Sequence, residues 1–256
     1  MCKFCYLLLL LSSLLLQSCQ HNDEDKKENT IKEARFDDAA KYNTQLGLAY
    51  LNQGDRSRAK RKLLLALSQA PESPGVNEAM AYYMEKSGDV EQAEIYYHKA
   101  MSLSKHAGTQ LNNYGTFLCR QGKYRASEKY FLKAVKDIAY DHTAGAYENA
   151  GLCVLAIQDE KNAAIYFTKA LEQDPSRGQS LFELVKLLKK QDKIDEALMF
   201  LKKYTNLTLH NSTLLSLAIE VSEKAGKTEM AAEYQSTLSH LAENTGEQHE
   251  HDINYG

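Results

Sequence analysis

Small and apolar residues recur along most of this chain every 34 residues, and between them the pattern is that of amphipathic helices. Gly47, Ala81 and Gly115 occupy one recurring position, and Ala59 and Ala93 occupy another. Within each copy, apolar residues fall three or four positions apart in two stretches, which a short turn separates. The pattern therefore predicts an all-α chain built from repeated pairs of helices.

The first copy carries the tetratricopeptide repeat (TPR) motif, in which small, bulky and turn residues hold fixed positions over two helices. The matching residues are Leu46, Gly47, Tyr50, Gly54, Ala59, Leu63, Ala66 and Pro71. Later copies keep this register except for a two-residue insertion near 141–143. We predict six repeats, at 40–73, 74–107, 108–141, 144–177, 178–211 and 212–245. Resemblance to TPR proteins implies a right-handed superhelical solenoid of six helix-turn-helix repeats with a concave groove.

The end of the repeat array is marked by a polar substitution. The sixth repeat has Gln235 where the other repeats have a bulky anchor, as expected for a solvent-facing end cap. Beyond it, residues 246–256 are polar and we predict a disordered tail. His249 and His251 lie in this tail beside glutamates, but a flexible tail seldom forms a specific metal site. We therefore expect no metal there.

The N-terminus has the character of an export signal. Lys3 precedes an apolar run from Tyr6 to Leu16 that is too short to span a membrane. Leu16 to Cys19 then resembles a bacterial lipobox, although an ordinary secretory signal with a stray cysteine is an alternative. We predict a lipoprotein signal peptide at 1–18, lipidation at Cys19, and a lipidated flexible tether at 19–39 that is polar and mixed in charge. Gln20 after the cysteine implies, by resemblance, an outer-membrane protein that is lipid-anchored and faces the periplasm.

Two cysteines, Cys119 and Cys153, remain once the signal and the lipidated residue are set aside. They lie on the first helices of adjacent repeats, and an exported chain meets an oxidising compartment. We predict a disulfide between them, provided that their Cα atoms come within about 7 Å. The alternative is that both are buried free thiols acting as small apolar residues.

Composition excludes several functional classes. A net charge of −3 offers no basic field for nucleic acid. No nucleophile-elbow, zinc-protease or phosphate-binding glycine motif is present in the sequence. We therefore expect neither an enzyme nor a cofactor-binding protein.

A partner-binding groove is predicted along the first helices of the repeats, by resemblance to other TPR proteins. The predicted groove residues are Leu48, Leu51, Tyr82, Asn112, Thr116, Arg120 and Leu152. Its N-terminal part is apolar, which favours an apolar or helical peptide segment as the occupant. Alternatively, Leu48 and Leu51 pack against residues 36–40.

Two further segments resemble the type IV pilus biogenesis lipoproteins known as PilF or PilW. These are N-N-Y-G-x-F-L at Asn112–Leu118 and Y-E-N-x-G at Tyr147–Gly151. The resemblance implies a pilotin, a non-enzymatic adaptor that binds secretin subunits and promotes their localisation and multimerisation in the outer membrane. Its partners would be secretin subunits and, through the acylated N-terminus, outer-membrane lipid. The alternatives are a general periplasmic TPR scaffold for cell-wall hydrolases or proteases, and an enzyme that uses the His-rich tail.

Overall fold

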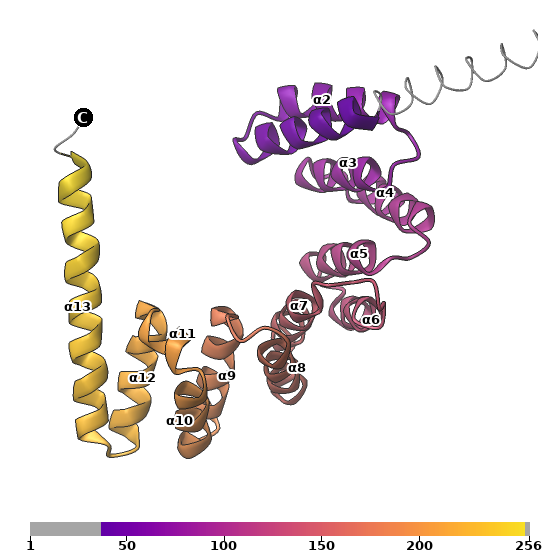
Figure 1. The fold of residues 1–256 in the computed structure, drawn as a ribbon. Helices are drawn as coiled ribbons and strands as arrows, with labels where there is room; N and C mark the ends of the chain where they lie inside the picture. Colours follow the sequence, from indigo (N-terminus) through magenta and orange to yellow (C-terminus); the bar gives the residue numbers. More distant parts are fainter. Residues whose placement is uncertain (1–36, 254–256) are drawn as a thin grey trace, which may run out of the picture. The chain divides into compact units, whose positions relative to one another are not determined.

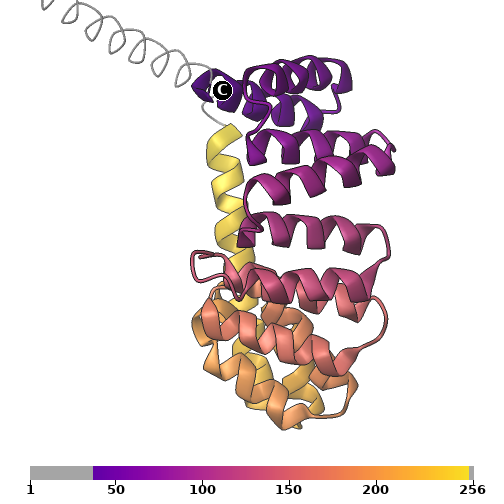
Figure 2. The same ribbon diagram turned by 90° about the vertical axis from the view of Figure 1, so that its right-hand side faces the viewer.

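The structure, a computed structural model, describes residues 37–253, with side chains described as far as residue 243. Within these residues every regular element is a helix, and the helices are joined in pairs by short turns (Figures 1 and 2). The predicted all-α TPR solenoid is confirmed. The chain divides into two compact units between Lys105 and His106. No described helix is both long enough and apolar enough to cross a membrane.

The first unit contains two helical hairpins. Its helices are at 37–52, α2 (Arg56–Gln69), α3 (Pro74–Lys86) and α4 (Val90–Leu103). Asp55 caps α2 by accepting the Arg58 backbone N–H at 2.9 Å, and Asp89 caps α4 in the same way. Ala59, Leu63 and Met80 are fully buried where the hairpins pack together. Local capping and a shared apolar seam therefore account for this unit.

The second unit contains the remaining hairpins. Its helices are α5 (Gly108–Arg120), α6 (Tyr124–Ala134), α7 (Thr143–Leu155), α8 (Glu160–Gln173), α9 (Gly178–Lys190), α10 (Ile194–Lys203), α11 (Thr205–Leu209), α12 (Ser212–Lys224) and α13 (Thr228–Ile253). Each predicted repeat in this unit contains a pair of long helices, and the short α11 is an addition that the repeat pattern does not predict.

Recurring small residues allow the two helices of a hairpin to approach closely. A Cβ atom added to Gly115 would lie 2.9 Å from the Phe131 ring, and one added to Gly151 would lie 2.6 Å from the Phe167 ring. Both phenylalanines are fully buried. The glycines and the bulky residues of the motif are therefore complementary halves of one contact.

The turn inside each hairpin requires a left-handed backbone. Gly122 occupies this position in the third repeat, with φ at 73°. In the fourth and fifth repeats the same position holds Gln158 and Asp192, with φ at 59° and 60°. These two side chains adopt a conformation that normally favours glycine.

The predicted boundaries need two corrections. Residues 37–39, assigned to the tether, are helical, so the first helix begins before residue 40. At the other end α13 continues to Ile253, and a helix replaces the predicted tail over 246–253. Glutamate and glutamine in this stretch are good helix formers, and the helix propagates past the last repeat. The signal peptide, Cys19 and the tether up to residue 36 lie outside the described residues.

Candidate partner-binding groove

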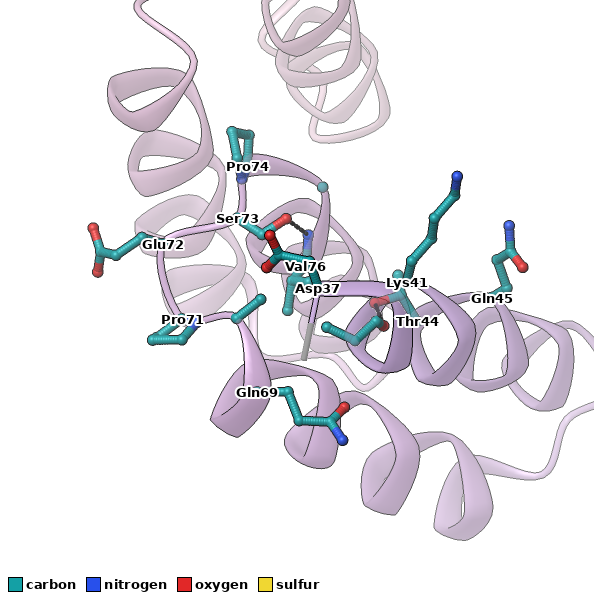
Figure 3. Close-up of a pocket in the computed structure, with 13 residues that line it drawn as sticks. Asp37, Lys41, Thr44, Gln45, Gln69, Pro71, Glu72, Ser73, Pro74 and Val76 are labelled. Carbon is teal, nitrogen blue, oxygen red and sulfur yellow. Dashed lines mark hydrogen bonds between the residues drawn. The ribbon is translucent and has the colours of Figure 1, made fainter. Parts of the chain in front are cut away.

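A cavity of about 890 Å³ opens in the first unit between the helix at 37–52 and the connection from α2 to α3 (Figure 3). Ala40, Ala70 and Val76 are buried and form its apolar floor, and Leu67 packs against these residues. Its rim is polar and carries charges of both signs. The rim side chains are Asp37, Lys41, Thr44, Gln45, Gln69 and Glu72. The cavity therefore suits an apolar side chain flanked by polar groups.

The α2–α3 connection is held in place by its own hydrogen bonds. Ser73 caps α3 by accepting the Val76 backbone N–H, and Pro74 occupies the first turn of the helix (Figure 3). Asn77, which is fully buried, donates from Nδ2 to the carbonyl oxygens of Pro71 at 2.9 Å and Ser73 at 2.8 Å. This wall of the cavity is consequently preorganised.

The opposite wall is tied to α2 by Asn43. Its Nδ2 donates to the Ala39 carbonyl at 2.9 Å and to Gln69 Oε1 at 3.0 Å, while its Oδ1 accepts from Lys62 Nζ at 3.3 Å. Lys41 and Gln45 extend from one side of the helix at 37–52 (Figure 3). The buried asparagine therefore sets the position of this helix against the rim.

Two of the predicted groove residues continue the walls of this cavity. Leu48 lies on the same helical face as Lys41 and Thr44, and Tyr82 lies on the same face of α3 as Gly75. Both side chains are half-buried against the core of the first unit. Lys86 Nζ lies 5.3 Å from the centre of the Tyr82 ring. Neither residue lines the cavity itself, and we call the cavity together with these two faces the candidate groove.

Leu51 is not part of the groove. Its side chain is only 8% exposed and belongs to the buried cluster with Leu63 and Met80. Leu51 lies seven residues after Thr44, on the same helical face, but residues of α2 and α3 pack against it at this end of the helix, which the motif alone does not reveal. Residues 37–40 are absent from this cluster, so packing against them does not explain the burial of Leu51.

The other predicted groove residues lie in the second unit, on α5 and α7. Asn149 Nδ2 donates to Asn112 Oδ1 at 3.2 Å, so Asn112 joins the two helices. Thr116 Oγ1 donates to the Asn112 carbonyl oxygen at 3.0 Å. Arg120 is exposed, and Leu152 is 38% exposed. Leu152 is thus an apolar contact point on this face, while Asn112 and Thr116 have local structural partners.

A disulfide joins Cys119 on α5 to Cys153 on α7, with Cα atoms 5.8 Å apart and a sequence separation of 34. Cys153 is buried, and its Sγ lies 3.3 Å from Ser127 Oγ. Ser127 Oγ itself donates to the Gly115 carbonyl oxygen at 2.7 Å. The bond links the third and fourth repeats inside the core.

A polar network on the second helices links the same two repeats. Arg125 pairs with Asp159 at 2.6 Å and with Glu128 at 3.1 Å. Hydrogen bonds from Asn162 and then Arg125 lower the pKa of Asp159, while burial and a hydrogen bond to Glu128 raise the pKa of Tyr166. Among the residues whose side chains are described, no group of three His, Cys, Asp or Glu could hold a metal ion.

Comparisons with known proteins agree with this architecture. No protein-family model matches the chain. The chain is 29% identical over 205 residues to the type IV pilus assembly protein PilF of Pseudomonas aeruginosa, covering 80% of this chain and 81% of PilF. It is 36% identical over 120 residues to an uncharacterized protein of Haemophilus influenzae, covering 47% of this chain and 67% of that protein.

Solved structures give the same result. The structure from a functional characterization of Pseudomonas aeruginosa PilF matches with a TM-score of 0.65 and 28% identity, covering 86% of this chain and 99% of that one. The chain is therefore similar to the type IV pilus biogenesis TPR protein PilF in both sequence and fold. PilW, a type IV pilus biogenesis factor, shares the fold with a TM-score of 0.61 and 24% identity, covering 78% and 91% of the two chains.

The two segments that resemble the PilF/PilW family occupy corresponding places. Asn112–Leu118 lies within α5 and Tyr147–Gly151 within α7. They include Asn112 and Asn149, which pair across the two helices, and Gly115 and Gly151, which admit the buried phenylalanines. In this chain the family segments therefore specify the joint between the third and fourth repeats.

Proposed function

We propose that this chain is a pilotin for type IV pilus biogenesis, anchored in the outer membrane through acylated Cys19 and facing the periplasm. It binds secretin subunits and promotes their outer-membrane localisation and multimerisation. It works as a non-enzymatic adaptor that holds a segment of another polypeptide. Three observations support this proposal: the similarity to PilF and PilW, the lipobox in the sequence, and the cavity in the first unit.

The observation that carries the assignment of the groove is the cavity with its apolar floor. Its volume is ample for apolar side chains of a peptide segment, and its rim offers Asp37, Lys41 and Glu72 to polar neighbours. Leu48 and Tyr82 extend the contact along the groove. A secretin segment with an apolar anchor residue and a polar flank fits these features.

Gly75 allows the cavity to be blocked without disturbing the core. It lines the cavity, and a Cβ atom added there meets no heavy atom within 4 Å. A side chain added at this position starts in open space, so we expect Gly75→Phe to obstruct the cavity without a clash at its Cβ atom. Ser57→Phe is the matched control, because Ser57 is also the second residue of its helix, is exposed, and lies outside the cavity lining.

A gene that encodes each variant replaces the natural gene. Secretin multimers are then followed by gel electrophoresis of isolated outer membranes. We expect Gly75→Phe and Tyr82→Ala to lose multimers, and Ser57→Phe to retain them. Circular dichroism verifies that the variants are folded. Undiminished multimers in folded Gly75→Phe would refute the groove as the secretin site. Capture of cell-wall hydrolases instead of secretin would favour the scaffold function.

Cys19→Ser tests the anchor separately. The variant should leave the outer-membrane fraction, and multimers should form in the wrong membrane or be lost. Persistence of the variant in the outer membrane at the natural level would contradict lipid anchoring at this residue.

A further inference from the structure

The loop between α6 and α7, residues 135–142, places an isoleucine entirely in solvent. Ile138 has a relative exposure of 104%, whereas Tyr42, another of the exposed large apolar residues, reaches 64%. The loop contains the two-residue insertion that interrupts the repeat register. A lone exposed apolar residue is ordinary on a protein surface. The residues around Ile138 therefore decide whether its exposure indicates a binding surface.

The loop is held rigidly enough to present this side chain. Asp137 Oδ2 accepts the Gly108 backbone N–H at 2.7 Å, and its Oδ1 accepts the Ala139 N–H at 3.0 Å. The Tyr140 N–H closes the turn onto the Asp137 carbonyl at 3.1 Å. Tyr140 is buried against Gly108, where an added Cβ would lie 2.4 Å from the tyrosine Cβ. Both ends of the turn are anchored, and Ile138 projects from its tip.

The neighbouring helices carry a row of lysines. Lys129 and Lys133 lie one turn apart on the exposed side of α6, and Lys136 follows its end. On α8 the equivalent positions hold Ile165, 42% exposed, and Lys169, with Lys161 one turn earlier. The two helices are neighbours, because Tyr166 of α8 donates to Glu128 of α6 at 2.7 Å. We call this surface the basic face: Lys129, Lys133, Lys136, Ile138, Lys161, Ile165 and Lys169.

The acidic groups near the basic face are mostly engaged by other partners. Glu128 and Asp159 are held by Arg125, and Asp137 anchors the turn. Asp141 and Glu172 are the exposed acidic side chains that remain beside it. Five lysines therefore concentrate positive charge on one surface of a chain whose net charge is −3.

We propose that the basic face binds the surface of an anionic phospholipid membrane. The lysine ammonium groups meet lipid phosphates, and Ile138 and Ile165 enter the boundary between headgroups and acyl chains. Protein interfaces are depleted in lysine and enriched in aromatic residues and arginine, whereas the basic face combines lysines with exposed isoleucines. This composition favours a lipid surface over a protein partner. The contact is additional to the acyl anchor and does not depend on it.

The test uses residues 20–256, which contain every described helix and lack the acylated cysteine. The protein is sedimented with phosphatidylethanolamine vesicles that contain either phosphatidylglycerol or, as the neutral reference, phosphatidylcholine. We expect binding to the anionic vesicles only, weakening as salt increases. Lys129→Gln/Lys133→Gln/Lys136→Gln should weaken it roughly a hundredfold, at about fivefold per lysine. Ile138→Ser should weaken it about tenfold through lost apolar burial.

The control removes equal charge from another layer of the same unit. Lys186→Gln/Lys189→Gln/Lys190→Gln alters α9, a first helix, and should change vesicle binding less than about threefold. Absence of binding, equal binding to neutral vesicles, or equal loss in the control would each overturn the proposal. So would an Ile138→Ser variant that binds vesicles normally but fails to capture a protein partner. None of these outcomes bears on secretin capture by the groove in the first unit.

Discussion

The disulfide between Cys119 and Cys153 offers a quantitative test of how the second unit is held together. In the chain-entropy model, closing a loop across a sequence separation of 34 residues stabilises the folded state by about 4 kcal/mol. Domain stabilities are typically about 5–15 kcal/mol. The bond is therefore expected to supply a large share of the stability of the third and fourth repeats.

The packing around Cys153 must be separated from the covalent bond. Cys153 is buried beside Ser127, and its sulfur fills space whether or not it is oxidised. We compare the oxidised protein, the reduced protein and Cys119→Ala/Cys153→Ala by urea unfolding. The difference in the free energy of unfolding between the oxidised and the reduced protein isolates the contribution of the bond, which should be up to about 4 kcal/mol. The difference between the reduced protein and the double alanine variant isolates the contribution of packing by the two sulfurs, which should be about 1–2 kcal/mol.

The expected signature is specific to the second unit. Far-UV circular dichroism records both units in both redox forms. Reduction should move one part of the dichroism transition to lower urea and leave the other part in place. In the reduced protein, labelling of the freed thiols of Cys119 and Cys153 should follow the part that moves, because these thiols lie in the second unit. An oxidised protein no more stable than the reduced one would refute the reasoning.

Three further predictions concern the same unit. Gly151→Ala should destabilise the second unit by about 1–3 kcal/mol in urea unfolding, because the new Cβ would lie 2.6 Å from the buried ring of Phe167. Unchanged stability would contradict this close contact. Gln158→Gly should raise its thermal midpoint, since φ is 59° there and glycine removes about 1 kcal/mol of strain; a lower midpoint would be inconsistent with this. Hydrogen bonding by Asn162 lowers the pKa of Asp159, so its contribution to stability is present at neutral pH and lost as pH falls below about 4. Asp159→Asn should reduce the loss of unfolding free energy at acidic pH, measured by urea unfolding as a function of pH. An unchanged loss would exclude the effect.

The fold follows closely from the sequence because its contacts are local and repeated. Gly115 and Gly151 are conspicuous at one motif position, and each meets a phenylalanine that the motif also predicts. The cysteine pair could be predicted from the sequence for the same reason, since a spacing of one repeat places two residues on adjacent first helices. Sequence periodicity is sufficient wherever a contact joins a repeat to itself or to its neighbour.

The candidate site was harder to predict because it depends on residues outside the motif. The cavity combines Ala40, Ala70 and Val76 from three elements, and buried Asn77 shapes its wall. An asparagine that forms two backbone hydrogen bonds has no distinct signature in sequence. Leu51 shows the opposite error, since its position in the repeat predicted a groove contact but packing against α2 and α3 places it in the core.

The loop at 135–142 also bears on how such a chain can change over evolutionary time. Its turn is secured by Asp137 and Tyr140, which both contact Gly108 at the start of the same repeat, and the helices on either side keep their register. Extra length at a junction between repeats therefore costs little, because only the adjoining hairpins adjust to it. Such junctions are places where a solenoid can gain new surface chemistry while its interior sequence stays constrained.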